Sequence, residues 1–171
     1  MRPLTLFFTM TLTCSLFASS VQLSNVVLYQ PNAVLHVRLG NVTSLATYIK
    51  SVRTICESSF QTEDAEALDI VIVMKPNGKS RVWFISTLLK MPDRSKVKQA
   101  IEAVAVPSVK GGPIVFALCY NLNGVARMKT ADGTIQPPIP DEWKAKTKDI
   151  KGPLVMPDGF IPLVWPDEEK T

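Results

Sequence analysis

Five short apolar runs along the chain have the pattern of β-strands. They lie at residues 25–29, 33–39, 68–75, 80–87 and 113–120. In the second run, Leu35, Val37 and Leu39 share one face of a strand, while His36 and Arg38 share the other. Only residues 30–32 separate the first two runs, which therefore predict an N-terminal β-hairpin over residues 25–39.

Two further stretches have the spacing of amphipathic helices. Between residues 44 and 59, apolar side chains recur every three or four positions, and Thr43 or Ser44 is the expected N-cap. A second helix is expected to start at Pro92-Asp93. Its apolar face holds Val97, Ala100, Ile101 and Val104.

The runs at 68–75 and 80–87 are joined by Pro76-Asn77-Gly78-Lys79. Asn-Gly between two apolar strands is a strong hairpin signal, because both residues tolerate a positive φ. The first of these strands is apolar on both faces, as expected of a central strand that is covered on both sides. Together the elements predict an α+β fold with a small, mostly antiparallel sheet in the order helix–strand–strand–helix–strand.

This order over residues 44–121 resembles the C-terminal domain of TonB and TolA-type periplasmic proteins. The resemblance rests on the strand and turn at 68–79, the helix at 97–104, Pro107, and Gly111-Gly112-Pro113 before the last strand. It implies a small α/β module that joins inner-membrane machinery to outer-membrane partners through protein contacts, without catalysis. It also implies a sheet with the strand at 68–75 between the other two. Val106 stands where the family usually has an aromatic residue, and no Pro-rich spacer precedes the domain.

From Gly124 onward the chain becomes rich in proline, with seven of its 13 prolines between residues 137 and 166. One interpretation is a solvated, disordered tail. The other, which the large apolar side chains favour, is an extended Pro-rich segment over residues 125–171 that packs on the domain. The candidate interaction surface combines the second sheet face with this tail. It consists of Val71, Val73, Trp83, Ile85, Trp143 and Trp165.

The N-terminus has the three parts of a secretion signal over residues 1–20: Arg2, a short apolar run, and small residues before a cut after Ser20. The alternative is an uncleaved N-terminal anchor. Cleavage would leave an α+β domain over residues 21–124 and the tail, with no stable membrane span. We therefore expect a periplasmic or secreted protein. The formal net charge of +4 is mild and its basic residues are scattered, which argues against nucleic-acid binding.

Cleavage would also remove Cys14 and leave two cysteines, Cys56 and Cys119. Outside the cytoplasm such a pair can form a disulfide, and Cys56 and Cys119 are the candidate pair. The alternative, equally compatible with the sequence, is two small buried thiols.

No residue set predicts a catalytic, cofactor or metal site. His36 is the single histidine and has no acid or nucleophile near it in sequence. The prediction is therefore a non-catalytic protein-interaction module of the cell envelope, with a protein partner and no cofactor. The alternative is a secreted enzyme of unfamiliar type that uses carboxylates such as Asp64, Asp69 or Asp93.

Overall fold

The computed structural model describes residues 21–60, 66–86, 94–124, 136–149 and 157–167, and shows an α+β fold. The elements follow in the order β1 (Val21–Leu28), α1 (Asn32–Leu39), α2 (Val42–Ser59), β2 (Glu66–Met74), β3 (Ser80–Ser86), α3 (Arg94–Glu102), β4 (Ile114–Leu122), α4 (Asp141–Thr147) and α5 (Pro157–Val164). The predicted signal at residues 1–20 lies outside the described residues.

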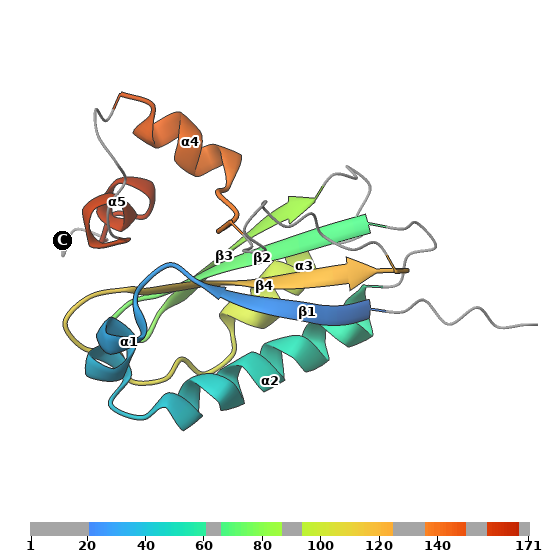
Figure 1. Cartoon of the computed structure of the whole chain (residues 1–171), viewed down its shortest axis with the longest axis horizontal. Coiled ribbons are helices and arrows are strands. Elements are labelled where there is room, and N and C mark those ends of the chain that lie inside the picture. The colour runs from blue at the N-terminus through green and yellow to red at the C-terminus, as the bar shows by residue number, and fades with distance from the viewer. Residues whose placement is uncertain (1–20, 61–65, 87–93, 125–135, 150–156, 168–171) are drawn as a thin grey trace, which may run out of the picture.

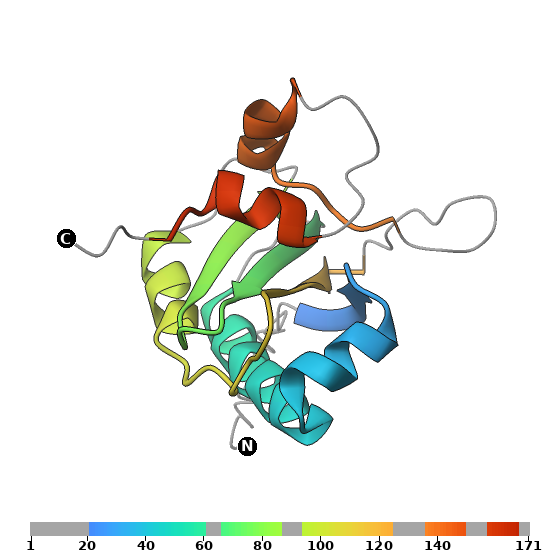
Figure 2. The same ribbon diagram turned by 90° about the vertical axis from the view of Figure 1, so that its left-hand side faces the viewer.

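The four strands form one sheet in the order β1-β4-β2-β3, and every neighbouring pair is antiparallel. Strand β2 lies between β3 and β4, the position predicted for it, and Leu68 to Met74 are all buried. Helices α1 and α2 lie on one side of the sheet and α4 and α5 on the other (Figures 1 and 2).

Helix α2 buries the stripe that the sequence indicated, with Leu45, Tyr48, Val52 and Cys56 in the core. Its N-cap is Asn41, whose side chain accepts a hydrogen bond from the Thr43 backbone N–H, so the helix begins slightly earlier than predicted. On α3, Val97 and Ile101 are buried against the same side of the sheet. This first core therefore lies between the sheet and the two longest helices.

The β2–β3 hairpin is confirmed. The Gly78 N–H donates to the Lys75 carbonyl, and the Lys75 N–H donates to the Lys79 carbonyl. Gly78 has a φ of 75°, which a glycine adopts without steric cost, and the Asn77 side chain accepts from the Lys79 N–H. The turn thus fixes the two lysines at one end of the sheet.

The predicted hairpin at 25–39 is wrong. Residues 32–39 form α1, and β1 pairs with β4 instead of with its sequence neighbour. Leu35 and Leu39 are buried in both arrangements, but in the helix Arg38 is buried beside them and Val37 is 79% exposed. Residues four apart lie on one face of either element, so the leucines alone could not distinguish them.

The tail packs on the domain, but it is not extended. Helices α4 and α5 cover the second face of the sheet and bury Trp143, Phe160, Ile161 and Val164 against it. Pro140 directly precedes α4 and Pro157 is the first residue of α5. Proline fits the start of a helix, where its missing N–H has no intrahelical partner, so these two prolines mark helix starts, whereas Pro162 lies inside α5.

Among the helices that the structure describes, none has the length and apolar content needed to cross a bilayer.

Candidate functional site

The predicted interaction residues do gather in one cluster, on the sheet face that α4 and α5 cover. Val71, Val73 and Trp83 are buried there beneath the helices, and Trp143 is part of the cover itself. Ile85 and Trp165 are only half-buried at its margin. The chain's own C-terminal segments therefore cover most of this surface.

The predicted disulfide is wrong. Cys56 and Cys119 are free thiols, and they lie in different cores on opposite sides of the sheet. The reason is that side chains alternate along β4. Leu118 and Tyr120 face the side of the sheet that α2 covers, so Cys119 between them faces the side that α4 and α5 cover. Burial raises the pKa of the Cys56 thiol to about 12, which leaves almost no thiolate for chemistry at neutral pH.

Of the three carboxylates of the alternative enzyme hypothesis, the structure describes one, Asp69. Asp64 and Asp93 lie outside the described residues, and Asp69 is buried within β2. His36 is exposed on α1. Among the residues that the structure describes, no three histidine, cysteine or acidic side chains are close enough to hold a metal ion.

Several polar contacts attach the C-terminal segments to the rest of the chain. We call these segments, residues 136–149 and 157–167, the clasp. Tyr29 donates to the Pro138 carbonyl, and the Trp83 indole N–H donates to Glu142 at 2.8 Å. Two others are ion pairs, Arg38–Asp158 at 2.5 Å and Lys75–Asp167 at 2.6 Å. In each of these the donor belongs to the domain and the acceptor to the clasp.

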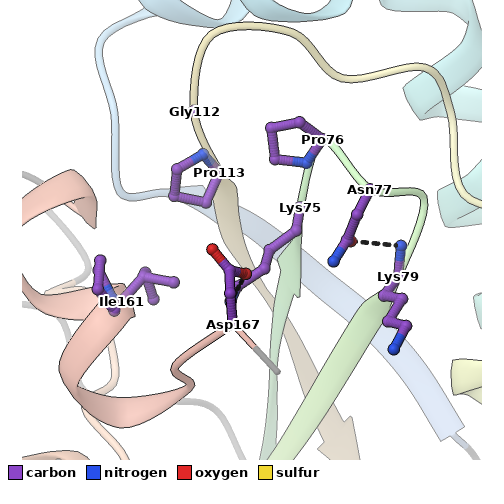
Figure 3. Close-up of a pocket in the computed structure, with 9 residues that line it drawn as sticks. Lys75, Pro76, Asn77, Lys79, Gly112, Pro113, Ile161 and Asp167 are labelled. Atoms are coloured by element: carbon purple, nitrogen blue, oxygen red, sulfur yellow. Dashed lines mark hydrogen bonds and ion pairs between the residues drawn. The ribbon is translucent and has the colours of Figure 1, made fainter. Parts of the chain in front are cut away.

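A cavity of about 570 Å³ opens where the β2–β3 turn meets the end of the clasp (Figure 3). Its walls come from the turn, from the loop before β4 and from the clasp. The lining residues are Lys75, Pro76, Asn77, Lys79, Gly112, Pro113, Ile161, Pro162 and Asp167. Figure 3 shows the Lys75 side chain running toward Asp167, between Ile161 and Lys79. The cavity is thus mainly apolar, with an ion pair inside it.

Lys75 holds a short piece of the clasp. Its ammonium donates to the Trp165 carbonyl and to the Asp167 carboxylate, both at 2.6 Å, and lies 4.5 Å from the centre of the Trp165 ring. The Arg81 guanidinium lies 5.7 Å from the centre of the same ring. A cation over an aromatic face is attracted by the ring's quadrupole. Lys75 and Arg81 thus contact a backbone carbonyl, an indole ring and a carboxylate within three consecutive residues.

The loop that forms another wall is fixed by side chains from distant elements. The Pro113 carbonyl accepts hydrogen bonds from Arg38 and from Gln30, both at 2.6 Å, and the Arg38 carbonyl accepts from the Lys110 N–H. Gly112 has a φ of 145°, and a Cβ there would lie 2.9 Å from the Arg38 guanidinium carbon. Only glycine leaves room for that guanidinium, so this wall of the cavity is preorganised.

No local pattern in the sequence indicates the contacts around Lys75. Lys75 and Trp165 lie 90 positions apart, and the residues next to each of them in the sequence form no recognisable binding motif. Trp165 was predicted to pack on the domain, but its neighbour Asp167 and the two basic residues were missed. A search for segments of opposite charge could have found them. Residues 165–167 combine an aromatic, a proline and an acid, and Lys75 and Arg81 flank the β2–β3 turn.

Comparisons with protein-family models, with curated proteins and with solved structures found no match to the chain. The likeness of residues 44–121 to TonB-type domains therefore stays a prediction.

Proposed function

We propose that the chain is a secreted or periplasmic, non-catalytic protein-interaction module of the cell envelope, which binds its partner at the cavity beside Lys75. The observation that carries the proposal is that Lys75, in the wall of this cavity, already binds a segment of polypeptide. Lys75 contacts the carbonyl, ring and carboxylate groups of residues 165–167. These are groups that a segment of a partner protein can also offer, and none of them is arranged for covalent chemistry.

Several titratable side chains elsewhere in the described structure are either buried or paired on the surface, which supports binding over catalysis. The Cys56 thiol is buried with a raised pKa, and burial likewise raises the pKa of the neighbouring Tyr120 phenol. Arg53–Glu57 and Lys98–Glu102 are surface ion pairs along helices. A general acid, base or nucleophile needs access to a substrate, which the buried thiol and phenol lack.

The proposed location in the cell envelope follows from the TonB-type likeness. In that family a small module of this kind joins partners in the envelope by protein contacts, and the order of β3, β2 and β4 here agrees with what the likeness implies. The signal pattern at residues 1–20 supports the same compartment. The partner of this chain would therefore be another envelope protein.

Site-specific photo-cross-linking in cells of the source organism tests the proposal. A photoreactive residue replaces Asn77, which is exposed at the cavity rim, and in a control chain it replaces Lys50, which is exposed on α2 across the sheet. We expect a discrete adduct with one envelope protein from position 77 and none from position 50. Equal adduct patterns from the two positions, or chain retained in the cytoplasm, would contradict the proposal.

A further inference from the structure

The contacts of residues 165–167 with the sheet have the form of peptide recognition. Lys75 supplies two hydrogen bonds, one to a backbone carbonyl and one to a carboxylate two residues later. Arg81 lies between two indole rings, 5.8 Å from the centre of Trp83 and 5.7 Å from the centre of Trp165. Together the two cations select an aromatic residue followed two positions later by an acid.

We infer that this site binds a segment of a partner protein with an aromatic residue followed two positions later by a carboxylate, and that residues 165–167 are its tethered occupant. The inference rests on the proposed function and adds the chemistry of the partner. It also assigns the end of the clasp a competitive role, because a partner segment of this kind would use the groups that now hold Trp165 and Asp167.

The two partners of the ion pair differ greatly in exposure. The Lys75 side chain is 8% exposed, whereas the Asp167 side chain is 81% exposed. The cation is therefore built into the domain, while the anion approaches it from the solvent side. A buried ammonium needs an anionic or dipolar partner, but any carboxylate delivered to the same place meets that need. The Asp167 carboxylate can thus be replaced without rebuilding the site.

The cavity leaves room beside the tethered segment. Its volume of about 570 Å³ lies within the range of sites that bind small ligands, which runs from about 300 to 1,000 Å³. Pro76, Pro113, Ile161 and Pro162 provide an apolar surface next to the ion pair. A partner segment longer than three residues would bury its flanking apolar side chains on this surface. The resident segment places only Asp167 there.

Because residues 165–167 are part of the same chain, a partner segment must bind strongly enough to displace them. A segment on the same chain competes at an effective concentration of roughly millimolar when its linker is short and flexible. The apparent affinity for an added segment falls by the fraction of molecules in which the site is free. Weakening the resident segment should therefore strengthen the binding of a segment added in trans.

A peptide-binding experiment tests the inference. The probe is a fluorescent peptide with the sequence of residues 160–167 and an amidated C-terminus, so that its aspartate is its single carboxylate. The proteins are the mature wild-type chain and a full-length Trp165→Ala/Asp167→Asn variant. By fluorescence anisotropy we expect at least about tenfold tighter binding to the variant than to wild type, because the tethered competitor is weakened.

Two controls show whether the binding uses the proposed contacts. Replacing the probe's aspartate by asparagine should weaken binding about tenfold, as expected for loss of one charge-assisted hydrogen bond. Adding Lys75→Met to the variant removes both hydrogen bonds of the ammonium and should weaken binding by at least as much. If circular dichroism shows that the double variant is unfolded, Asp167→Asn alone takes its place, with a smaller gain expected. Equal binding with and without Lys75, or no binding to a folded variant, would overturn the inference.

The outcome separates this inference from the proposed function. If position 77 still cross-links to an envelope protein but the peptide does not bind, the partner uses other chemistry at the rim and only the inference fails. If the peptide binds as expected but no envelope protein is cross-linked, the recognition chemistry holds and the proposed cellular role fails.

Discussion

Three acidic side chains of the clasp meet donors that are far more buried than they are. Asp158 is 46% exposed where it meets Arg38 at 9%, and Glu142 likewise remains largely open to solvent beside the buried Trp83. A change on the buried side therefore removes packing and several hydrogen bonds at once, whereas a change on the exposed side removes one contact.

Arg38→Lys should destabilise the protein by about 1–3 kcal/mol. The guanidinium bridges the Pro113 carbonyl and Asp158 with two separate nitrogens, and the single ammonium of lysine cannot reproduce that fork. The matched control is Arg53→Lys on α2, where the pair with Glu57 is exposed and the substitution should matter far less. Urea unfolding of both variants measures the difference. Equal losses would show that Arg38 is not a structural bridge.

Both thiols of the mature chain should resist alkylation in the native state. Cys56 and Cys119 are both buried and so closed to the reagent, and the pKa of Cys56 is also raised to about 12, which leaves it almost no thiolate. Mass spectrometry after iodoacetamide treatment at pH 8 should show no adducts on native protein. The same protein unfolded without reductant should gain two. Failure to gain them would restore the disulfide that the sequence suggested.

Helical stripes and tight turns were predictable because the signals are local. The stripe on α2 repeats over about three turns, and Asn77-Gly78 specifies its own geometry. Helix α1 was not predictable in this way. Its eight residues contain leucines four apart, which fit a strand and a helix equally, and only the burial of Arg38 against the β4 loop decides between them.

The helices of the clasp were missed for a related reason. Proline was taken to indicate extended chain, but at Pro140 and Pro157 it occupies positions where helices begin. The large side chains gave the more reliable signal, since Trp143 and Phe160 are buried as expected. The Trp143 ring centre lies 5.0 Å from that of Trp83 in the sheet and 5.1 Å from that of Phe160.

Deleting residues 137–171 should lower the melting temperature by more than about 5 °C and increase the binding of a hydrophobic dye. The deletion would expose Val71, Val73 and Trp83, and burying each such side chain stabilises a fold by about 1.5–3 kcal/mol. The control deletion removes only residues 168–171. A melting temperature unchanged by the longer deletion would mean that the clasp does not stabilise the sheet.

At the scale of the whole molecule, the candidate site joins three distant parts of the chain. The turn after β2, the loop before β4 and the end of α5 meet only because the sheet and the clasp are both in place. The sequence predicted which face the clasp would cover, since that face is apolar. It could not predict where the clasp's last residues would meet the sheet, because one ion pair decides that position.

The mature protein should begin at or near Val21 and be found in a soluble envelope or extracellular fraction. The three-part pattern of residues 1–20 motivates this, and cleavage there would keep every described residue of β1. Intact-mass measurement of the exported protein checks it. Exported protein that retains residues 1–20 would favour the uncleaved anchor.

The pairing of β1 with β4 has a consequence for the order of folding. Ser24 of β1 donates a hydrogen bond to the Cys119 carbonyl, 95 positions later, so the first strand cannot be incorporated until nearly the whole domain has been synthesised. Contacts between such distant segments form slowly, whereas the β2–β3 hairpin closes locally. If residues 1–20 act as a leader, the strand beside it stays unstructured during synthesis, which keeps the nascent chain competent for threading through a translocation channel. Pulsed hydrogen exchange during refolding should then show β1 amides protected after those of β2 and β3, and simultaneous protection would argue against this order.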